Sequence, residues 1–220
     1  MKKKKIKLIQ NFKKINFNQN FIFSALNLSF LSYFCLGIIK TPNSMFLWCD
    51  GIIGSLKSNI KKTPGSKFIK IFYRYKFSKI LIAGNYSSKQ IKYLQKKFKT
   101  KVEGFFIPNV SYVSVKKYLP KVDKNTLILI TLPTPKQEIL AYAISKKKIN
   151  YKIVCIGGGL SIVTGEVKEC PKFLSNIGLE FIWRLRTDTT RRLQRLITTF
   201  FLFLFYFLIG KISSIRVTKI

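Results

Sequence analysis

The 220-residue chain contains no histidine and only eight acidic residues, against 41 lysines and arginines. The lack of histidine excludes a Ser-His or Cys-His nucleophile and any histidine metal ligand. A general base is therefore expected among the carboxylates. These are Asp50, Glu103, Asp123, Glu138, Glu166, Glu169, Glu180 and Asp188.

Cysteine is also scarce, and its spacing argues against two kinds of site. The chain has four cysteines, and no two of them form a Cys-x-x-Cys pair. This arrangement is typical of free thiols in a reducing compartment, rather than of a disulfide framework or a zinc site.

The excess of basic residues gives a formal charge of +33, which favours polyanionic partners such as nucleic acid, an anionic membrane or phosphorylated substrates. Nucleic-acid binding is disfavoured because the chain has no helix-turn-helix, RNP, KH or zinc pattern, and its basic residues are spread over every predicted element. With 47% hydrophobic residues the chain can bury a core. We therefore expect one folded domain with an appendage.

Two uncharged stretches raise the question of a membrane. Residues 15–39 carry no charge, but asparagine, glutamine and serine interrupt them, so we expect a strand and a helix rather than a signal peptide or a span. Residues 196–209 are apolar and aromatic, and as a helix they would reach about 21 Å, short of the ~30 Å hydrocarbon core. Because arginines precede this segment and Lys211 follows it, we predict that it lies in an anionic membrane surface. Docking on the core or on a partner subunit is the alternative.

Strand-like and helix-like patterns alternate through residues 21–174, which predicts an α/β fold with a doubly wound, mostly parallel, Rossmann-like sheet. Residues 1–20 are expected to be a basic, loosely ordered lead, and residues 175–220 a helical C-terminal appendage that contains the membrane-contacting segment 196–209. Helices within the domain are expected at residues 52–60, 66–77, 88–99, 110–119 and 135–148.

Polar residues follow several predicted strands. Lys136, Gln137 and Glu138 begin a helix directly after the buried strand 126–130, which is where an α/β sheet binds ligands. Asp50-Gly51, Gly84-Asn85 and Gly157 to Gly159 follow other strands. No Gly-x-Gly-x-x-Gly or Walker motif is present. The sequence thus predicts a substrate cleft at one sheet edge, with Asp50 as its carboxylate.

Several segments resemble the WecG/TagA/CpsF glycosyltransferases, in family order from about Asn27 to Arg195. Pro135-Lys-Gln-Glu138 resembles the family's PKQE signature, and Cys49-Asp50-Gly51-Ile52 resembles its ADG segment. Weaker matches are Ala25-Leu26-Asn27, the glycine-rich block from Ile156 to Gly165, Cys170-Pro-Lys-Phe173 and the segment from Gly178 to Leu185.

The resemblance implies transfer of N-acetylmannosamine or a related sugar from a UDP-sugar to a polyprenyl-diphosphate-linked saccharide. The reaction would take place at the cytoplasmic face of the bacterial inner membrane, in the synthesis of lipopolysaccharide, teichoic acid or capsule. It would use neither a metal nor a cofactor. A homo-oligomer is possible.

The resemblance also assigns roles to residues. Asp50 would be the general base, and Asn27 and Gln137 would lie in the cleft. Lys136, Glu138 and Gly158 belong to the same matching segments and are candidate substrate-binding residues. Arginines of the appendage would bind the diphosphate, and the matching positions are Arg184, Arg191 and Arg195.

The chain departs from the family pattern at four places. Pro133-Thr134 stands where the family has glycine, and Ala25 where it has threonine. Ser161 replaces an aspartate and Phe181 a tryptophan, so the glycine-rich block is expected to lack a charge. The sequence therefore leaves open a non-catalytic or degenerate paralogue that acts as an assembly protein in the same pathway.

Overall fold

The structure is a computed structural model. It describes residues 4–12, 15–50, 60, 62–147, 150–171, 173–174, 183 and 189–220, with only the backbone described at 189, 191 and 192.

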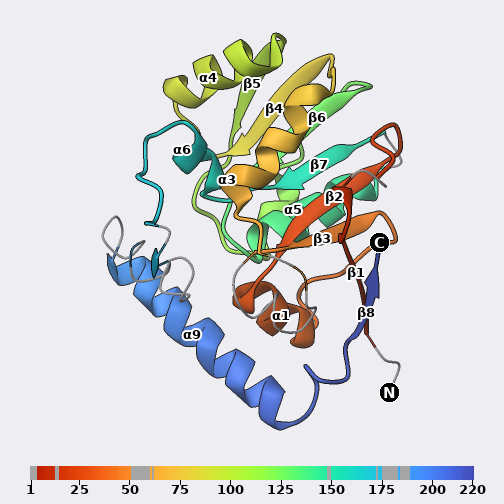
Figure 1. The fold of residues 1–220 in the computed structure, drawn as a ribbon, viewed down its shortest axis with the longest axis vertical. Helices are drawn as coiled ribbons and strands as arrows, with labels where there is room; N and C mark the ends of the chain where they lie inside the picture. Colours follow the sequence, from red (N-terminus) through yellow and green to blue (C-terminus); the bar gives the residue numbers. More distant parts are fainter. Residues whose placement is uncertain are drawn as a thin grey trace.

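Within these residues, eight strands form one sheet in the order β5-β4-β6-β7-β2-β3-β1-β8 (Figure 1). Every described pairing is parallel, which confirms the predicted α/β class with a parallel, Rossmann-like sheet. The central strand β6 is buried along its whole length, which explains its uncharged, apolar sequence. The strands are β1 (Lys5–Leu8), β2 (Phe21–Leu26), β3 (Met45–Cys49), β4 (Lys79–Gly84), β5 (Lys101–Phe106), β6 (Thr126–Ile130), β7 (Lys152–Cys155) and β8 (Arg216–Lys219).

Helices cover both faces of the sheet, and each face has its own hydrophobic core. One face is covered by α1 (Leu28–Cys35), the short 3-10 helix η3 (Val115–Lys117), α5 (Lys136–Ser145) and α9 (Thr189–Leu208). The other face is covered by α3 (Gly65–Phe68), the 3-10 helix η2 (Ile69–Arg74), α4 (Ser88–Phe98) and α6 (Gly159–Val163). The neighbouring strands β2 and β3 therefore send their connections to opposite faces, as do β4 and β6; in α/β sheets, ligands bind at such points, beyond the carboxyl ends of the strands.

Local sequence signals located two of these helices well. The helix expected at 88–99 is α4, and Ser87 and Gln90 form its capping box. The helix expected at 135–148 is α5. Residues 15–39 contain β2 and α1, so the expectation of a strand and a helix is confirmed. Within the described residues, no helix combines the length and the apolar character needed to cross a bilayer.

Other helix predictions were wrong in extent. The helix expected at 66–77 begins at Gly65, and from Ile69 to Arg74 it has 3-10 geometry. Only Val115–Lys117 is helical in the expected helix 110–119, whose β-branched valines have low helix propensity. The helix expected at 52–60 lies outside the described residues except for Ile60, which is not helical.

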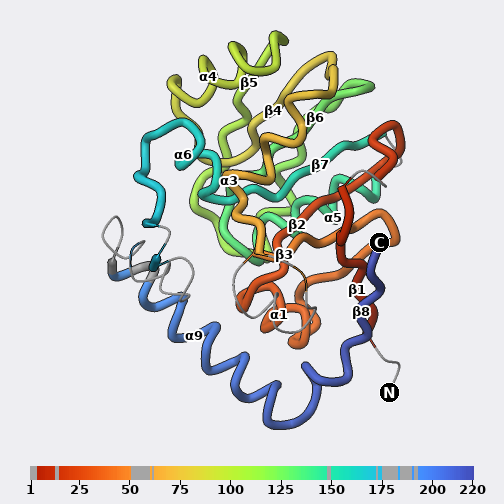
Figure 2. The backbone as a smooth tube through the Cα atoms, in the orientation of Figure 1, coloured from red at the N-terminus to blue at the C-terminus, as the bar shows by residue number. Residues whose placement is uncertain are grey.

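Both ends of the chain differ from expectation because they pair with each other. Strand β1 lies in the lead that was expected to be loose, and its Ile6 and Leu8 are buried. The appendage, expected to be helical throughout, ends in β8, which pairs with β1 (Figure 2). Exposed cationic side chains on β8 are typical of an edge strand, where charge opposes pairing with another chain.

Candidate active site

The carboxyl ends of the parallel strands meet at one edge of the sheet, and the predicted site residues follow these ends. Asn27 comes directly after β2 and Asp50 directly after β3, which are neighbouring strands with Leu26 opposite Cys49. The backbone N–H of Asp50 donates to the carbonyl of Leu26 at 3.2 Å. The sheet thus brings Asn27 and Asp50 side by side.

The Asn27 side chain is held by the start of α1. Its Oδ1 accepts a hydrogen bond from the backbone N–H of Phe30 at 2.9 Å, so it caps the helix. This bond fixes the amide beside the edge. Asp50 is half-buried, so its carboxylate is accessible from this edge.

Gln137 and Glu138 lie in a buried polar network beneath the same edge. Glu138 is 1% exposed, and its Oε1 accepts from Ser24 Oγ at 2.7 Å, Gln137 Nε2 at 2.9 Å and Thr134 Oγ1 at 3.2 Å. Ser24 belongs to β2, so the network links the start of α5 to the strand that ends at Asn27. Among the described residues, the buried Glu138 Oε2 and Gln137 Oε1 have no hydrogen-bond partner.

Burial dominates the electrostatics of this network. It raises the pKa of the Glu138 carboxyl, and the hydrogen bonds from Ser24, Gln137 and Thr134 only partly oppose the rise. Burial also raises the pKa of the Cys155 thiol well above its usual value, with the nearby Glu138 adding to the effect. The network therefore favours a neutral carboxylic acid and a neutral thiol.

The glycines after β7 have distinct roles. Gly157 has a φ of +52° and lies beside Gln137, whose Oε1 would be 3.6 Å from a Cβ at this position. A Cβ on Gly159 would be 3.3 Å from the carbonyl carbon of Gly65, so this glycine allows α6 to approach α3 closely. A Cβ on Gly158, a predicted substrate-binding position, would meet no atom of the described residues within 4 Å.

Lys136, also predicted to bind substrate, contacts a loop outside the Glu138 network. Its exposed Nζ donates to Asn109 Oδ1 at 2.9 Å. Asn109 lies in the loop after β5, so this bond ties the start of α5 to a second loop of the carboxyl edge.

A carboxylate near Ser161 was missed by sequence reasoning. Gln90 Nε2 donates to Ser161 Oγ at 3.0 Å and to Glu166 Oε2 at 2.6 Å, so a carboxylate from just outside the uncharged glycine-rich block shares a hydrogen-bond donor with Ser161. Burial raises the pKa of Glu166, but hydrogen bonds from Ser87, Gln90 and Thr164 outweigh it and hold the pKa below its usual value. Only the turn after α6 brings Glu166 back beside Ser161, and no sequence spacing signals that turn.

The predicted arginines are only partly described. Arg184 lies outside the described residues, and only the backbone of Arg191 is described, in the first turn of α9. Arg195 is close enough to Tyr33 that its positive charge opposes the rise that burial causes in the Tyr33 pKa. Because β8 enters parallel to β1, the preceding α9 runs from the carboxyl edge towards the amino edge. The arginine-bearing turns of α9 are therefore the part of this helix that lies towards the carboxyl edge, with Arg195 near Tyr33 of α1.

These groups can bind a polar, anionic substrate and accept a proton at Asp50. Within the described residues, no three Cys, Asp or Glu side chains are grouped so that they could hold a metal ion.

A comparison with protein families identifies the fold and its chemistry. The model described as "Glycosyl transferase WecG/TagA/CpsF family" matches residues 67–216, which is more than half of the chain. Gln137, Glu138 and the arginines lie within the matched segment, whereas Asn27 and Asp50 precede it. The chain belongs to the WecG/TagA/CpsF family and is a glycosyltransferase of cell-surface polysaccharide synthesis.

Proposed function

We propose that this chain transfers a sugar such as N-acetylmannosamine from a UDP-sugar to a polyprenyl-diphosphate-linked saccharide. The observation that carries the proposal is the placement of Asp50 beside Asn27 at the carboxyl edge, in a chain of this family. A half-buried carboxylate at this edge can act as a base, and the neighbouring amide can orient a sugar hydroxyl.

In the proposed step, the acceptor hydroxyl gives its proton to the Asp50 carboxylate. The acceptor oxygen forms a bond to the anomeric carbon of the donor sugar as the bond between that carbon and the UDP oxygen breaks. UDP leaves with the bonding electron pair, so negative charge develops on its diphosphate. Arg184, Arg191 and Arg195 are proposed to stabilise that charge, since guanidinium groups form bidentate bonds with phosphates. Arg191 and Arg195 are one turn apart and share one face of α9.

Gln137 and Glu138 are proposed to act at different distances from the substrate. Gln137 lies next to Gly157, and its oxygen has no hydrogen-bond partner in the described part of the chain, so it is the candidate for substrate contact. Glu138 is enclosed and bonded to three neighbours, which supports a positioning role for it.

We also propose that α9 holds the protein on the anionic cytoplasmic leaflet of the inner membrane. Its buried side packs on α1, where Ser32 Oγ donates to the carbonyl of Thr199 at 2.9 Å. Its other side exposes apolar side chains that no described segment covers, and they support insertion at the lipid interface. They are Ile197, Phe200, Phe201, Leu204, Phe205 and Leu208.

The test is release of UDP when the purified full chain meets candidate UDP-sugars together with short-chain lipid diphosphate-linked acceptors. We expect release to require both substrates and to be lost in Asp50→Asn. The matched control is Asp123→Asn, which removes an exposed carboxylate that pairs with Lys79. If the folded protein binds acceptor but releases no UDP with any donor, the non-catalytic assembly role replaces the enzyme.

A further inference from the structure

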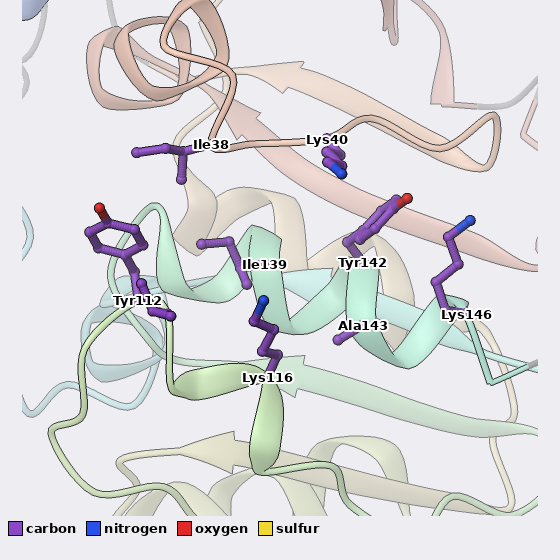
Figure 3. Close-up of a pocket in the computed structure, with 9 residues that line it drawn as sticks. Ile38, Lys40, Tyr112, Lys116, Ile139, Tyr142, Ala143 and Lys146 are labelled. Carbon is purple, nitrogen blue, oxygen red and sulfur yellow. The ribbon is translucent and has the colours of Figure 1, made fainter.

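A second concave site lies on the outer side of α5, away from the sheet edge (Figure 3). The pocket has a volume of about 370 Å³, within the range of small-molecule sites, about 300–1,000 Å³. Ile139 and Tyr142 supply part of its wall, together with Ile38 from the segment after α1. The neighbouring positions Leu140 and Ala141 face the core instead, so α5 separates this pocket from the buried Glu138 network.

Three lysines from three different segments line this apolar pocket. Lys40 follows α1, Lys116 belongs to η3 and Lys146 follows α5. Lys40 Nζ lies 5.9 Å and Lys146 Nζ 5.3 Å from the centre of the Tyr142 ring, so two ammonium groups lie near this one ring. Among the described residues, no carboxylate lines the pocket or forms an ion pair with these lysines.

Such a lining combines uncompensated positive charge with an apolar wall. Ammonium groups around one pocket repel one another, and an anion bound in the pocket reduces that repulsion. A phosphate group fits this requirement as a compact anion. The apolar wall requires a hydrocarbon part in the same ligand, because apolar surface gains free energy when a ligand covers it.

We propose that this pocket binds the phosphate ester of an apolar chain. The phosphate would lie among Lys40, Lys116 and Lys146, and the first part of the chain would cover Ile38, Ile139 and Tyr142. A prenyl phosphate and the headgroup region of an anionic phospholipid share this chemistry. The site is separate from the proposed sugar transfer, and its occupancy is measured without any transfer reaction.

The experiment is calorimetric titration of the full chain with geranyl phosphate. Geraniol and inorganic phosphate are the probes for the two halves of the ligand. We expect geranyl phosphate to bind at least about tenfold more tightly than either half, which corresponds to about 1.4 kcal/mol. Its affinity should fall as salt is raised, because exposed charges are screened. Dihexanoyl phosphatidylglycerol, titrated in parallel, distinguishes a phospholipid diester from a prenyl monoester.

Two variants locate the binding. Replacing Lys40, Lys116 and Lys146 together by glutamine should weaken geranyl phosphate binding at least about tenfold. Ala143→Phe fills the pocket without changing the charge and should also weaken it. The charge-matched control replaces Lys92, Lys96 and Lys97 of α4 by glutamine. Because α4 lies on the opposite face of the sheet, this variant should bind geranyl phosphate like the native chain.

The proposal is overturned if the α4 control weakens binding as much as the pocket lysines do, since the effect would then be net charge alone. It is also overturned if Phe201→Ser with Phe205→Ser abolishes binding, because the probe would then lie on α9. Circular dichroism checks the fold of each variant. If Ala143→Phe does not fold, the comparison of the two lysine variants decides.

Discussion

Replacing Glu138 by glutamine and by alanine tests whether this buried carboxyl organises the site or takes part in the reaction. Alanine removes the oxygen that accepts from Ser24, Gln137 and Thr134. Gln137 Nε2 keeps its bond to Thr134 Oγ1 at 3.1 Å, but the Ser24 hydroxyl, which is 0% exposed, loses its carboxyl acceptor and keeps only the Cys155 thiol as a neighbour. Glutamine keeps an acceptor oxygen and nearly the same shape.

The expected losses of stability follow from these contacts. A buried donor left without an acceptor costs about 1–3 kcal/mol. Alanine leaves one Gln137 N–H without its acceptor and leaves the Ser24 hydroxyl with only the weakly accepting Cys155 sulfur, so we expect the free energy of unfolding to fall by about 2–6 kcal/mol. For glutamine we expect a loss below about 2 kcal/mol, because only the position of Oε2, which has no partner in the native network, changes.

The pH dependence gives a second, independent readout. Burial raises the pKa of Glu138 from its ordinary value of 4.5, so the folded chain keeps this proton at pH values where the unfolded chain has lost it. The contribution of Glu138 to stability is therefore largest below pH 4.5. This contribution falls as pH rises from 4.5 through the folded-state pKa. The total loss is about 1.4 kcal/mol for each unit by which the folded-state pKa exceeds the unfolded-state pKa. Glutamine cannot titrate, so the stability of Glu138→Gln relative to the native chain should improve as pH increases.

These differences can be measured by urea unfolding of the native chain, Glu138→Gln and Glu138→Ala at several pH values from 4.5 to 8. Tryptophan fluorescence reports the unfolding. Equal destabilisation by glutamine and alanine at every pH would refute the acceptor role. Transfer activity supplies the remaining distinction. A stable Glu138→Gln variant that loses transfer as completely as Asp50→Asn would show that Glu138 takes part in the reaction.

Four further predictions concern other parts of the chain. Asp50→Asn should lower the turnover about 10²–10⁴-fold with an unchanged circular dichroism spectrum, as expected for loss of a general base; near-normal turnover would exclude that role. Arg191→Ala should weaken UDP-sugar use by about 1.5–3 kcal/mol in kcat/KM, and unchanged kinetics would favour a structural arginine. Phe201→Ser with Phe205→Ser should reduce sedimentation with anionic vesicles, and equal sedimentation would place the membrane contact elsewhere. Gly84→Ala should destabilise the fold in thermal unfolding, because φ is +123° and the new Cβ would be 2.6 Å from Thr131 Oγ1; an unchanged Tm would contradict the close approach.

The point substitutions on α9 replace a deletion of residues 196–220 as the membrane test. In the structure, Tyr206, Ile212 and Ile215 are buried in the core, and β8 completes the sheet beside β1. A deletion would expose Ile6 and Leu8, so it would change the fold as well as the membrane contact.

The sequence by itself determined the features that depend on short segments. The uncharged run of β6 and the capping residue Ser87 placed a strand and a helix, because burial and helix capping act within a few residues. Strand ends in a parallel sheet share one edge, so Asn27, Asp50 and Gln137 could be assigned to that edge before the structure was known.

Only the tertiary structure decided the features that depend on distant pairing. Strand β1 is stable because β8 lies beside it, and neither short strand has a local signal strong enough to show this. The Glu138 network requires Ser24, which is distant in sequence, and the carboxylate near Ser161 comes from the turn after α6. The α5 pocket likewise draws its lysines from three segments. The physical reason is the same in each case: charge, burial and hydrogen bonding act through space, and chain folding sets those distances.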